Sequence, residues 1–345
     1  MRRAVLFPGG GIPLRDMCVL APEAEAAGFD TIYCVEAYRS GLVPLTAVAT
    51  VTSRIGVGTY VLNAHARPPV AAGMAARDLD ELSQGRLVLG VGSGNPHINV
   101  HHLGVDDRSP LRTLTEYVTG LQAVVRGRPG DEVEFDYAGS HISWRPSVEP
   151  TRPAIPIYLA AMYPRMRRVA ALEADGLALG SLHSAEYVKT VIEPAVDEAL
   201  TERGRARSSF DIVLTVLTSV GTDAEQARRT ARRALCRLFT PLPHPYYEAI
   251  LREHGWSEMV DGISTAMGAG KEEAAVDLVG DEVVDEVLVA GDVAQCEAAL
   301  ARYEGIVDEI VLVDATSIDS TLRSETETPD ALAAFRAVMQ LRPAV

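Results

Sequence analysis

The segment from residue 54 to residue 95 places the strongest constraint on the fold of this chain. Ile55–Leu62 is a short, mainly apolar run that predicts a β-strand, and Arg86–Val91 predicts a second strand. Between them, Pro68 and Pro69 can open a helix, because the first helical position needs no N–H donor. Apolar residues then recur at helical spacing. Two strands joined by a short-looped helix are expected to lie parallel, with a right-handed crossover.

The same alternation continues along the rest of the chain. The other predicted strands are Arg3–Phe7, Thr31–Val35, Ile155–Ala160, Gly176–Ser181, Phe210–Val220 and Glu309–Val313. The other predicted helices are Pro13–Ala27, Pro44–Thr52, Leu111–Val125, Tyr163–Ala174, Ser184–Glu202, Asp223–Leu238, Val293–Tyr303 and Pro329–Met339. Strands that alternate with helices in this way predict the α/β class, as a single TIM (β/α)8 barrel with insertions. An open doubly wound sheet is the alternative.

Some segments fall outside this alternation. Asn95–Ser109 is predicted to be a long polar loop. Asp131–Trp144 alternates in polarity and turns at Ala138-Gly139, which predicts a β-hairpin inserted in the barrel. Phe239–Asp281 contains Phe239, Tyr246, Tyr247 and Trp256 and is interpreted as a helical insertion, which either forms a lid over the pocket or packs against the rim of the barrel. No second domain boundary is visible, so residues 1–345 are predicted to form one barrel domain.

Composition restricts the class of function. The net charge of −15 argues against nucleic acid as a partner, since phosphate contacts need clustered Lys and Arg. No apolar run reaches the roughly 18 residues of a membrane-spanning helix, and no signal-peptide segment follows Met1. We therefore expect a cytoplasmic protein with no membrane partner. The four cysteines form no C-x-x-C pair and have no zinc spacing with histidine, so no metal site is expected.

Residues 54–94 resemble the central segment of the luciferase-like flavin- and deazaflavin-dependent oxidoreductases. Their sequence is RIGVGTYVLNAHARPPVAAGMAARDLDELSQGRLVLGVGSG. In that family an RI-x-(L/V)-GT strand is followed, one helix later, by LD-x-LS-x-GR-x-x-LG-(V/L)-G. Three further segments are also similar to the family: AAGFDTIYCVEAY, IPIYLAAMYPRMRRVAALEADGLALG and LVAGDVAQCEAALARYEGIVDEIVLV. The E-A-Y loop and the LGVGSGNPH segment most resemble the branch that uses the deazaflavin coenzyme F420.

The resemblance implies a barrel that binds F420, or FMN as the alternative, at the carboxyl ends of its strands. It implies an enzyme that transfers a hydride between this cofactor and an organic substrate. It also implies a non-proline cis peptide bond at Tyr60-Val61, beside the cofactor ring. Members of the family are usually homodimers, and a separate enzyme is expected to supply the reduced cofactor.

Glu36 ends the second predicted strand and is the first candidate for the catalytic site. The resemblance implies ring contact or acid/base catalysis, and a salt-bridged or capping carboxylate is the alternative interpretation. Some relatives that oxidise alcohols have a histidine base at the next position, where this chain has Ala37. This departure favours reduction of an activated C=C, C=N or C=O bond. Tyr38 and His97 are candidate proton donors.

The remaining candidates bind the cofactor. The expected ring contacts, besides Glu36, are Tyr60, Val61, Leu62, Asn63, Ser93, Gly94 and Asn95. The expected phosphate contacts lie in two strand-to-helix turns, where N–H groups and the helix dipole favour an anion: Ala161, Met162, Tyr163, Gly180, Ser181 and Leu182. Candidate partners for a polyanionic tail are Arg39, Arg67 and Arg165.

Two other functions remain consistent with the sequence. One is an FMN-dependent monooxygenase that receives reduced flavin from a separate reductase. The other is a non-catalytic flavin- or deazaflavin-binding protein that kept the fold and lost the acid/base group. The sequence does not identify the substrate, because one fold serves many reactions.

Overall fold

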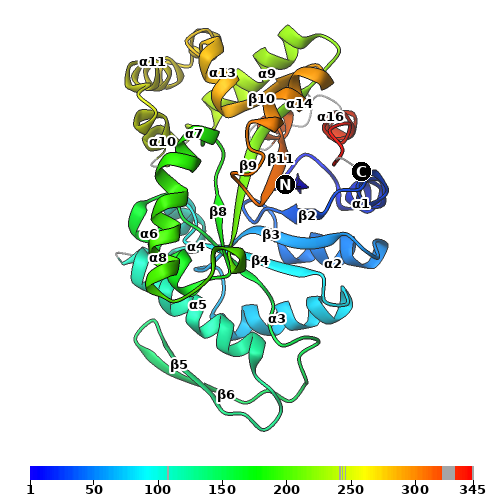
Figure 1. Ribbon diagram of the computed structural model, residues 1–345, viewed down its shortest axis with the longest axis vertical. Coiled ribbons are helices and arrows are strands. Elements are labelled where there is room, and N and C mark those ends of the chain that lie inside the picture. Colours follow the sequence, from blue (N-terminus) through cyan, green and yellow to red (C-terminus); the bar gives the residue numbers. More distant parts are fainter. Residues whose placement is uncertain (107–108, 241, 243, 245, 321–330, 344–345) are drawn as a thin grey trace.

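The computed structural model describes residues 1–106, 109–240, 242, 244, 246–320 and 331–343. The strands of its barrel, in chain order, are β1 (Arg2–Phe7), β2 (Thr31–Cys34), β3 (Gly56–Asn63), β4 (Leu87–Gly92), β7 (Ile157–Ala160), β8 (Gly176–Leu179), β9 (Asp211–Val220) and β11 (Glu309–Asp314). Each pairs in parallel with the next, and β11 pairs with β1 to close the ring (Figure 1). The predicted TIM barrel is therefore confirmed.

Helices follow the barrel strands. They are α1 (Leu14–Ala27), α2 (Leu42–Val51), α3 (Pro69–Leu82), α5 (Pro110–Arg126), α6 (Pro164–Glu173), α7 (Ala185–Tyr187), α8 (Glu193–Glu202), α9 (Ala224–Arg237), α14 (Val293–Ala301), α15 (Ala315–Ser320) and α16 (Ala331–Val338). The largest apolar core lies between the strands and these helices. Pro329, the predicted start of the last helix, lies outside the described residues.

Local sequence signals explain several helix ends. Pro69 occupies the first turn of α3. Gly28 ends α1 in the left-handed region, at φ 89°, which glycine adopts without a Cβ penalty. Asp292 and Gln295 form a capping box at the start of α14. These residues define where α1 ends and where α3 and α14 begin.

The strand β9 is the longest in the barrel and has two partners on one edge. Residues 211–214 pair with β8, whereas residues 217–220 pair with β10 (Leu288–Gly291). The sequence analysis missed β10. Its four residues directly precede α14, and so short an apolar run cannot be distinguished from a helix by periodicity.

The predicted polar loop after β4 is wrong, because it contains the helix α4 (Pro96–Leu103). Asn95 caps this helix: its Oδ1 accepts a hydrogen bond of 2.8 Å from the backbone N–H of His97. Gly104 ends the helix at φ 69°. Asn95 at the N-cap, Pro96 in the first turn and Gly104 at the end are helix signals. The polar character of the segment, which contains three histidines, had instead indicated a loop.

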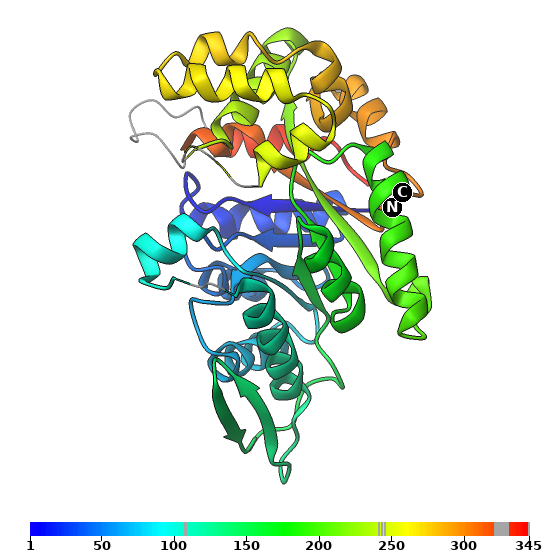
Figure 2. The same ribbon diagram turned by 90° about the vertical axis from the view of Figure 1, so that its left-hand side faces the viewer.

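Two excursions leave the barrel at opposite ends of the molecule (Figures 1 and 2). The first is an antiparallel hairpin of β5 (Val133–Tyr137) and β6 (Ser140–Trp144), which turns at Ala138 and Gly139 with positive φ. The second lies between α9 and β10 and contains α10 (Tyr247–Glu253), α11 (Ser257–Gly268), α12 (Glu272–Val276) and α13 (Asp281–Val287). Within the described residues, no helix has the length and apolar composition to cross a membrane.

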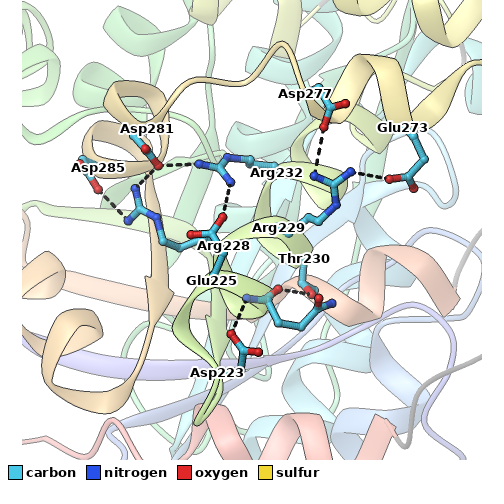
Figure 3. Close-up of polar contacts among 11 residues, drawn as sticks. Asp223, Glu225, Arg228, Arg229, Thr230, Arg232, Glu273, Asp277, Asp281 and Asp285 are labelled. Atoms are coloured by element: carbon cyan, nitrogen blue, oxygen red, sulfur yellow. Dashed lines mark hydrogen bonds and ion pairs between the residues drawn. The ribbon is translucent and has the colours of Figure 1, made fainter.

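A row of arginines on α9 binds acidic residues of α12 and α13 (Figure 3). Asp281 accepts from Arg228 at 2.7 Å and from Arg232 at 2.5 Å. Glu273 likewise bridges Arg229, at 2.7 Å, and Arg233, at 2.6 Å. Beneath these pairs, alanines of α9 belong to the same buried cluster as valines of α12 and α13. The second half of the insertion is therefore fixed to the barrel by charge and by packing.

Candidate active site

A cavity of about 600 Å³ opens at the carboxyl ends of the barrel strands. Residues that follow β1, β2, β3, β4, β7 and β8 form its floor and one side. The end of α9 and the helical insertion form the opposite side, through residues that include Arg237, His244, Tyr246 and Tyr247. This volume and position are typical of small-molecule sites in barrel enzymes.

The structure brings most of the predicted site residues together. The lining includes Glu36, Tyr38, Tyr60, Val61, Asn63, Ser93, Gly94, Asn95, His97, Ala161, Met162, Tyr163, Gly180 and Ser181. The predicted cis peptide bond between Tyr60 and Val61 is present. Residues from five different strand ends therefore meet at one cavity.

Two predicted contacts, Leu62 and Leu182, do not line the cavity, and both side chains are fully buried. The pairing of β3 with β4 shifts register between Thr59 and Leu62. Tyr60 and Val61 both line the cavity as a result, and Leu62 packs in the core on the helix side. Leu182 has φ 77°, and its side chain lies in a separate buried cluster.

Glu36 lines the cavity, but both of its carboxylate oxygens are bound. Arg67 donates to Oε1 at 3.0 Å and to Oε2 at 2.9 Å. The backbone N–H groups of Gly41 and Asn63 donate to the same carboxylate, each at 3.2 Å. Four donors fill the lone-pair positions of this carboxylate, so neither oxygen is left to exchange a proton with a substrate. The geometry favours the salt-bridged alternative over the acid/base role.

The side-chain amide of Asn63 is also occupied. Its Nδ2 donates to Asn99 at 2.8 Å, and its Oδ1 accepts from the backbone of His65 at 2.9 Å. Asn99 in turn donates to the carbonyl of Ser93 at 2.8 Å. Asn63 therefore shapes the wall by holding the loops after β3 and β4 together.

The hydroxyl of Tyr60 points into the barrel and away from any ligand. It lies 2.7 Å from the carbonyl oxygen of Leu179 and 3.1 Å from that of Val213. Burial raises the pKa of this hydroxyl well above its usual value. The ring packs edge-on against Tyr33, with centroids 5.3 Å apart. Tyr60 is thus part of the cavity wall and not a proton donor.

The two predicted proton donors lie at the rim of the cavity. Tyr38 is 58% exposed, and its ring centroid is 6.3 Å from that of His102. His97 is exposed on α4, and its ring lies 4.4 Å from His101 and 6.2 Å from His102. Among the described residues no cluster of His, Cys, Asp or Glu could hold a metal ion. The histidines therefore form an aromatic and titratable rim.

The two predicted phosphate turns face the cavity from β7 and β8. Ala161, Met162 and Tyr163 lead into α6, which has a proline at its first turn. In the second turn, His183 is buried, and its Nδ1 lies 2.8 Å from the carbonyl of Gly180. Burial lowers the pKa of His183 to about 3, so this ring carries no positive charge for an anion.

The predicted arginine partners of a polyanionic tail are used differently. Arg67 binds Glu36, and Arg39 donates to the carbonyl of Ile12 at 2.9 Å. Arg165 is exposed in the first turn of α6. The buried arginine of the cavity is instead Arg237, which binds the carboxylate of Glu272 with two nitrogens.

His244 is the functional candidate that the sequence analysis missed. It lines the cavity, is 7% exposed, and its Nε2 lies 3.1 Å from Nδ2 of Asn95. Nearby, the hydroxyl of Tyr246 donates to the carbonyl of Gly94 at 3.2 Å. The surrounding residues, TPLPHPYYE, have no periodicity that would indicate an inward-facing histidine.

Comparison with known proteins identifies relatives along most of the chain. The family model described as luciferase-like monooxygenase matches residues 2–309. The uncharacterized protein Rv1360 of Mycobacterium tuberculosis is 30% identical over 307 residues, which cover 85% of this chain and 89% of the relative. The putative coenzyme F420-dependent oxidoreductase Rv3520c of the same organism is 28% identical over 330 residues, covering 90% and 93%.

The fold is also found among solved structures. The coenzyme F420-dependent tetrahydromethanopterin reductase of Methanopyrus kandleri superposes with a TM-score of 0.77. The match covers 99% of this chain and 98% of that structure, at 19% sequence identity.

Proposed function

Because the chain belongs to the luciferase-like monooxygenase family, we propose that it is an oxidoreductase that transfers a hydride between coenzyme F420 and an organic substrate. The name of the relative Rv3520c supports this choice of cofactor. The observation that carries the proposal is the cavity itself. Its lining combines residues of β3 and β4 with two strand-to-helix turns and with side chains of the helical insertion.

The wall formed by β3 and β4 is the part of the cavity that we assign to the ring. Gly92 has no side chain, and a Cβ at this position would lie 2.8 Å from Cγ2 of Val61 and 3.1 Å from Cβ of Ala160. Glycine at residue 92 therefore leaves Val61 and Ala160 uncrowded on this wall. In this assignment the ring contacts Val61 and Gly92, and the phosphate-bearing tail follows the turns before α6 and α7.

When bound, the cofactor supplies the hydride chemistry, and the protein orients it and excludes water. Glu36 and Arg67 hold the end of β3 in place beside the ring. Tyr38 and His97 lie where the rim meets solvent and are the candidates for moving a proton to the product.

We assign the direction as reduction of an activated C=C, C=N or C=O bond. Alcohol oxidation needs a base near the substrate hydroxyl. Glu36 is bound on all sides, and Ala37 has no ionisable group. Burial lowers the pKa of His244 to about 4, so this histidine is a weak base. Reduction of an activated bond instead leaves an anion that solvent at the open rim can protonate, so it does not require such a base. We also expect a cytoplasmic homodimer that receives reduced cofactor from a separate enzyme.

A parallel fluorescence titration with F420 and with FMN tests the proposal. We expect tighter binding of F420, followed by loss of reduced F420 when a reducible substrate is added. Tighter binding of FMN, with oxygen consumption in the presence of reduced FMN, would identify a two-component monooxygenase instead. Binding of F420 without turnover across a broad substrate panel would support the non-catalytic alternative.

A further inference from the structure

His244 and Tyr246, in the segment between α9 and α10, line the cavity and contact the loop after β4 at two points. Asn95 Nδ2 lies 3.1 Å from Nε2 of His244, and the Tyr246 hydroxyl donates to the carbonyl of Gly94 at 3.2 Å. The imidazole also packs against the ring of Tyr247, with centroids 4.7 Å apart. His244 and Asn95 therefore face each other across one wall of the cavity.

The orientation of the Asn95 amide is set by its second contact. Its Oδ1 accepts the backbone N–H of His97 at 2.8 Å, as the cap of α4. The NH2 group must then point toward His244, because a flipped amide would place two donors against each other at the cap. On the far side of the imidazole, the backbone N–H of Tyr246 lies 3.4 Å from Nδ1.

Both imidazole nitrogens of His244 therefore face a hydrogen-bond donor. A neutral imidazole has one acceptor nitrogen and one N–H group, so it can satisfy only one of these donors. If Nε2 accepts from Asn95, the N–H on Nδ1 faces the N–H of Tyr246. If Nδ1 accepts from Tyr246, then Nε2–H and the Asn95 NH2 become two neighbouring donors on the cavity wall, 3.1 Å apart. Burial disfavours the charged imidazolium, which would leave both donors unsatisfied.

We propose that His244 and Asn95 form a two-donor site for one acceptor atom of the substrate, the oxygen of a carbonyl group. Binding of that oxygen selects the Nε2–H tautomer of His244, in which Nδ1 accepts from Tyr246. Every donor in the cluster then has an acceptor. His244 is in this assignment a specificity-determining residue that the helical insertion contributes.

The inference rests on the proposed function and narrows its substrate class. Two N–H groups that donate to the same oxygen stabilise negative charge on it more than they stabilise the neutral carbonyl. This preference suits ketones and esters, and also alkenes conjugated to a carbonyl, since in both cases reduction places charge on the oxygen. It gives no advantage to an isolated alkene, because an isolated alkene has no acceptor atom.

The tautomer of His244 can be observed directly, without cofactor or turnover. We would record long-range ¹H–¹⁵N spectra of the ¹⁵N-histidine-labelled full chain with acetone, cyclohexenone or N-methylacetamide, and with cyclohexene as the control without oxygen. The signal of His244 is assigned by its loss in His244→Gln. We expect conversion from Nδ1–H to Nε2–H with at least one carbonyl compound and no conversion with cyclohexene. An unchanged tautomer with all three carbonyl compounds, or an equal change with cyclohexene, would overturn the proposal.

Matched variants separate the two donors. Asn95→Asp keeps an acceptor for the α4 cap but removes the NH2 donor, and His244→Phe keeps the ring contact with Tyr247 but removes both nitrogens. Each is expected to weaken binding of the converting carbonyl compound about tenfold, the effect of one lost hydrogen bond. His244→Gln, which restores an amide donor, should recover most of this affinity. The control is His141→Gln on the distant hairpin.

A titration with F420 in the same samples keeps the two proposals apart. Unchanged F420 affinity with weakened carbonyl binding in His244→Phe supports the two-donor site; Asn95→Asp is read only for carbonyl binding, because Asn95 is itself an expected cofactor contact. Carbonyl affinity that is unaffected by both Asn95→Asp and His244→Phe would overturn it. Failure of the wild-type chain to bind F420 would overturn the proposed function and leave the tautomer measurement to decide the inference.

Discussion

The guanidinium of Arg67 binds both carboxylate oxygens of Glu36 on the wall of the cavity, at 3.0 and 2.9 Å. The same carboxylate accepts the backbone N–H of Gly41 at the start of α2 and that of Asn63 at the end of β3. The Glu36 side chain is 9% exposed and that of Arg67 is 24% exposed. This pair therefore joins the ends of two strands and one helix, and it positions the wall that we assign to the cofactor ring.

The substitution Glu36→Gln is expected to destabilise the fold. Glutamine preserves the size of the side chain, but it removes the charge and leaves Arg67 half-buried without its partner. We expect the free energy of unfolding to fall by about 1–3 kcal/mol. Affinity for F420 should also fall, because the loop at Asn63 loses an anchor. Urea unfolding monitored by circular dichroism, together with the cofactor titration, measures both effects.

The matched variant Arg67→Gln and the double variant complete a cycle that isolates the coupling between the two side chains. If the pair only positions the wall, the two side chains should stabilise the fold together, which gives a favourable coupling in the free energy of unfolding. The pH–rate profile of Glu36→Gln should then keep the shape of the wild-type profile. If the variant unfolds like the wild type and its profile loses one ionisation, Glu36 acts as an acid/base group and our assignment is wrong.

The barrel could be predicted from the sequence because its signals are local. Each strand is a short apolar run, and several helices have an end signal within a few residues of their boundary, such as Gly28 or Pro69. Parallel strand ends must then meet at one face, so residues such as Asn63, Ser93 and Ser181 could be assigned to a common cavity from their positions alone.

The direction of individual side chains could not be predicted in the same way. In a regular strand, Tyr60 and Leu62 would share a face. The register shift beside β4 instead turns Tyr60 and Val61 to the cavity and Leu62 to the outer core. Such an irregularity depends on the neighbouring strand, which a period of two within one strand does not reveal.

The roof of the cavity depends on contacts that are remote in sequence. His244 meets Asn95 across 149 residues, and Tyr246 meets Gly94 across 152. The helical insertion has no strand pattern that would fix its direction, so its aromatic residues indicated a cover without showing which side chain faces inward. Only the folded chain places a histidine beside the α4 cap.

Asp314 at the end of β11 is expected to make stability depend on pH. Its carboxylate accepts two hydrogen bonds from Thr316, one from the backbone N–H at 3.0 Å and one from the side-chain hydroxyl at 2.6 Å. Burial nevertheless raises its pKa from 3.8 to about 6. Between these two values the folded state binds a proton that the unfolded state does not bind. The free energy of unfolding should therefore fall as pH rises through this window, by about 3 kcal/mol from this group, and stay constant above it.

The substitution Asp314→Asn removes this titration. Urea unfolding across the same pH range should show a flatter dependence for the variant than for the wild type, and the difference between the curves isolates Asp314 from all other groups. Asp131→Asn, at an exposed position, is the control. Parallel curves for Asp314→Asn and the wild type would contradict the raised pKa.

Asp281→Asn is expected to loosen the second half of the insertion. This carboxylate bridges Arg228 and Arg232 (Figure 3), and those hydrogen bonds hold its pKa below its usual value. The variant should unfold at a lower temperature than the wild type in dilute buffer. Because salt screens exposed charges, the difference should shrink as sodium chloride is added.

Glu202→Gln breaks the isolated surface pair with Arg168 and should change stability little. A difference that does not respond to salt would exclude an electrostatic origin.

Gly92→Ala tests whether the cofactor ring lies against the wall of β3 and β4. The added Cβ would lie 2.8 Å from Cγ2 of Val61, closer than unstrained carbon atoms approach, so the wall must shift at Val61 or at residue 92. We expect F420 affinity to fall about tenfold, in keeping with the cost of overpacking a rigid site.

Gly221→Ala is the control, since the nearest atom to its Cβ would be 3.6 Å away and the residue does not line the cavity. Unchanged affinity in Gly92→Ala, with an unfolding midpoint that confirms an intact fold, would show that the ring does not lie against this part of the wall.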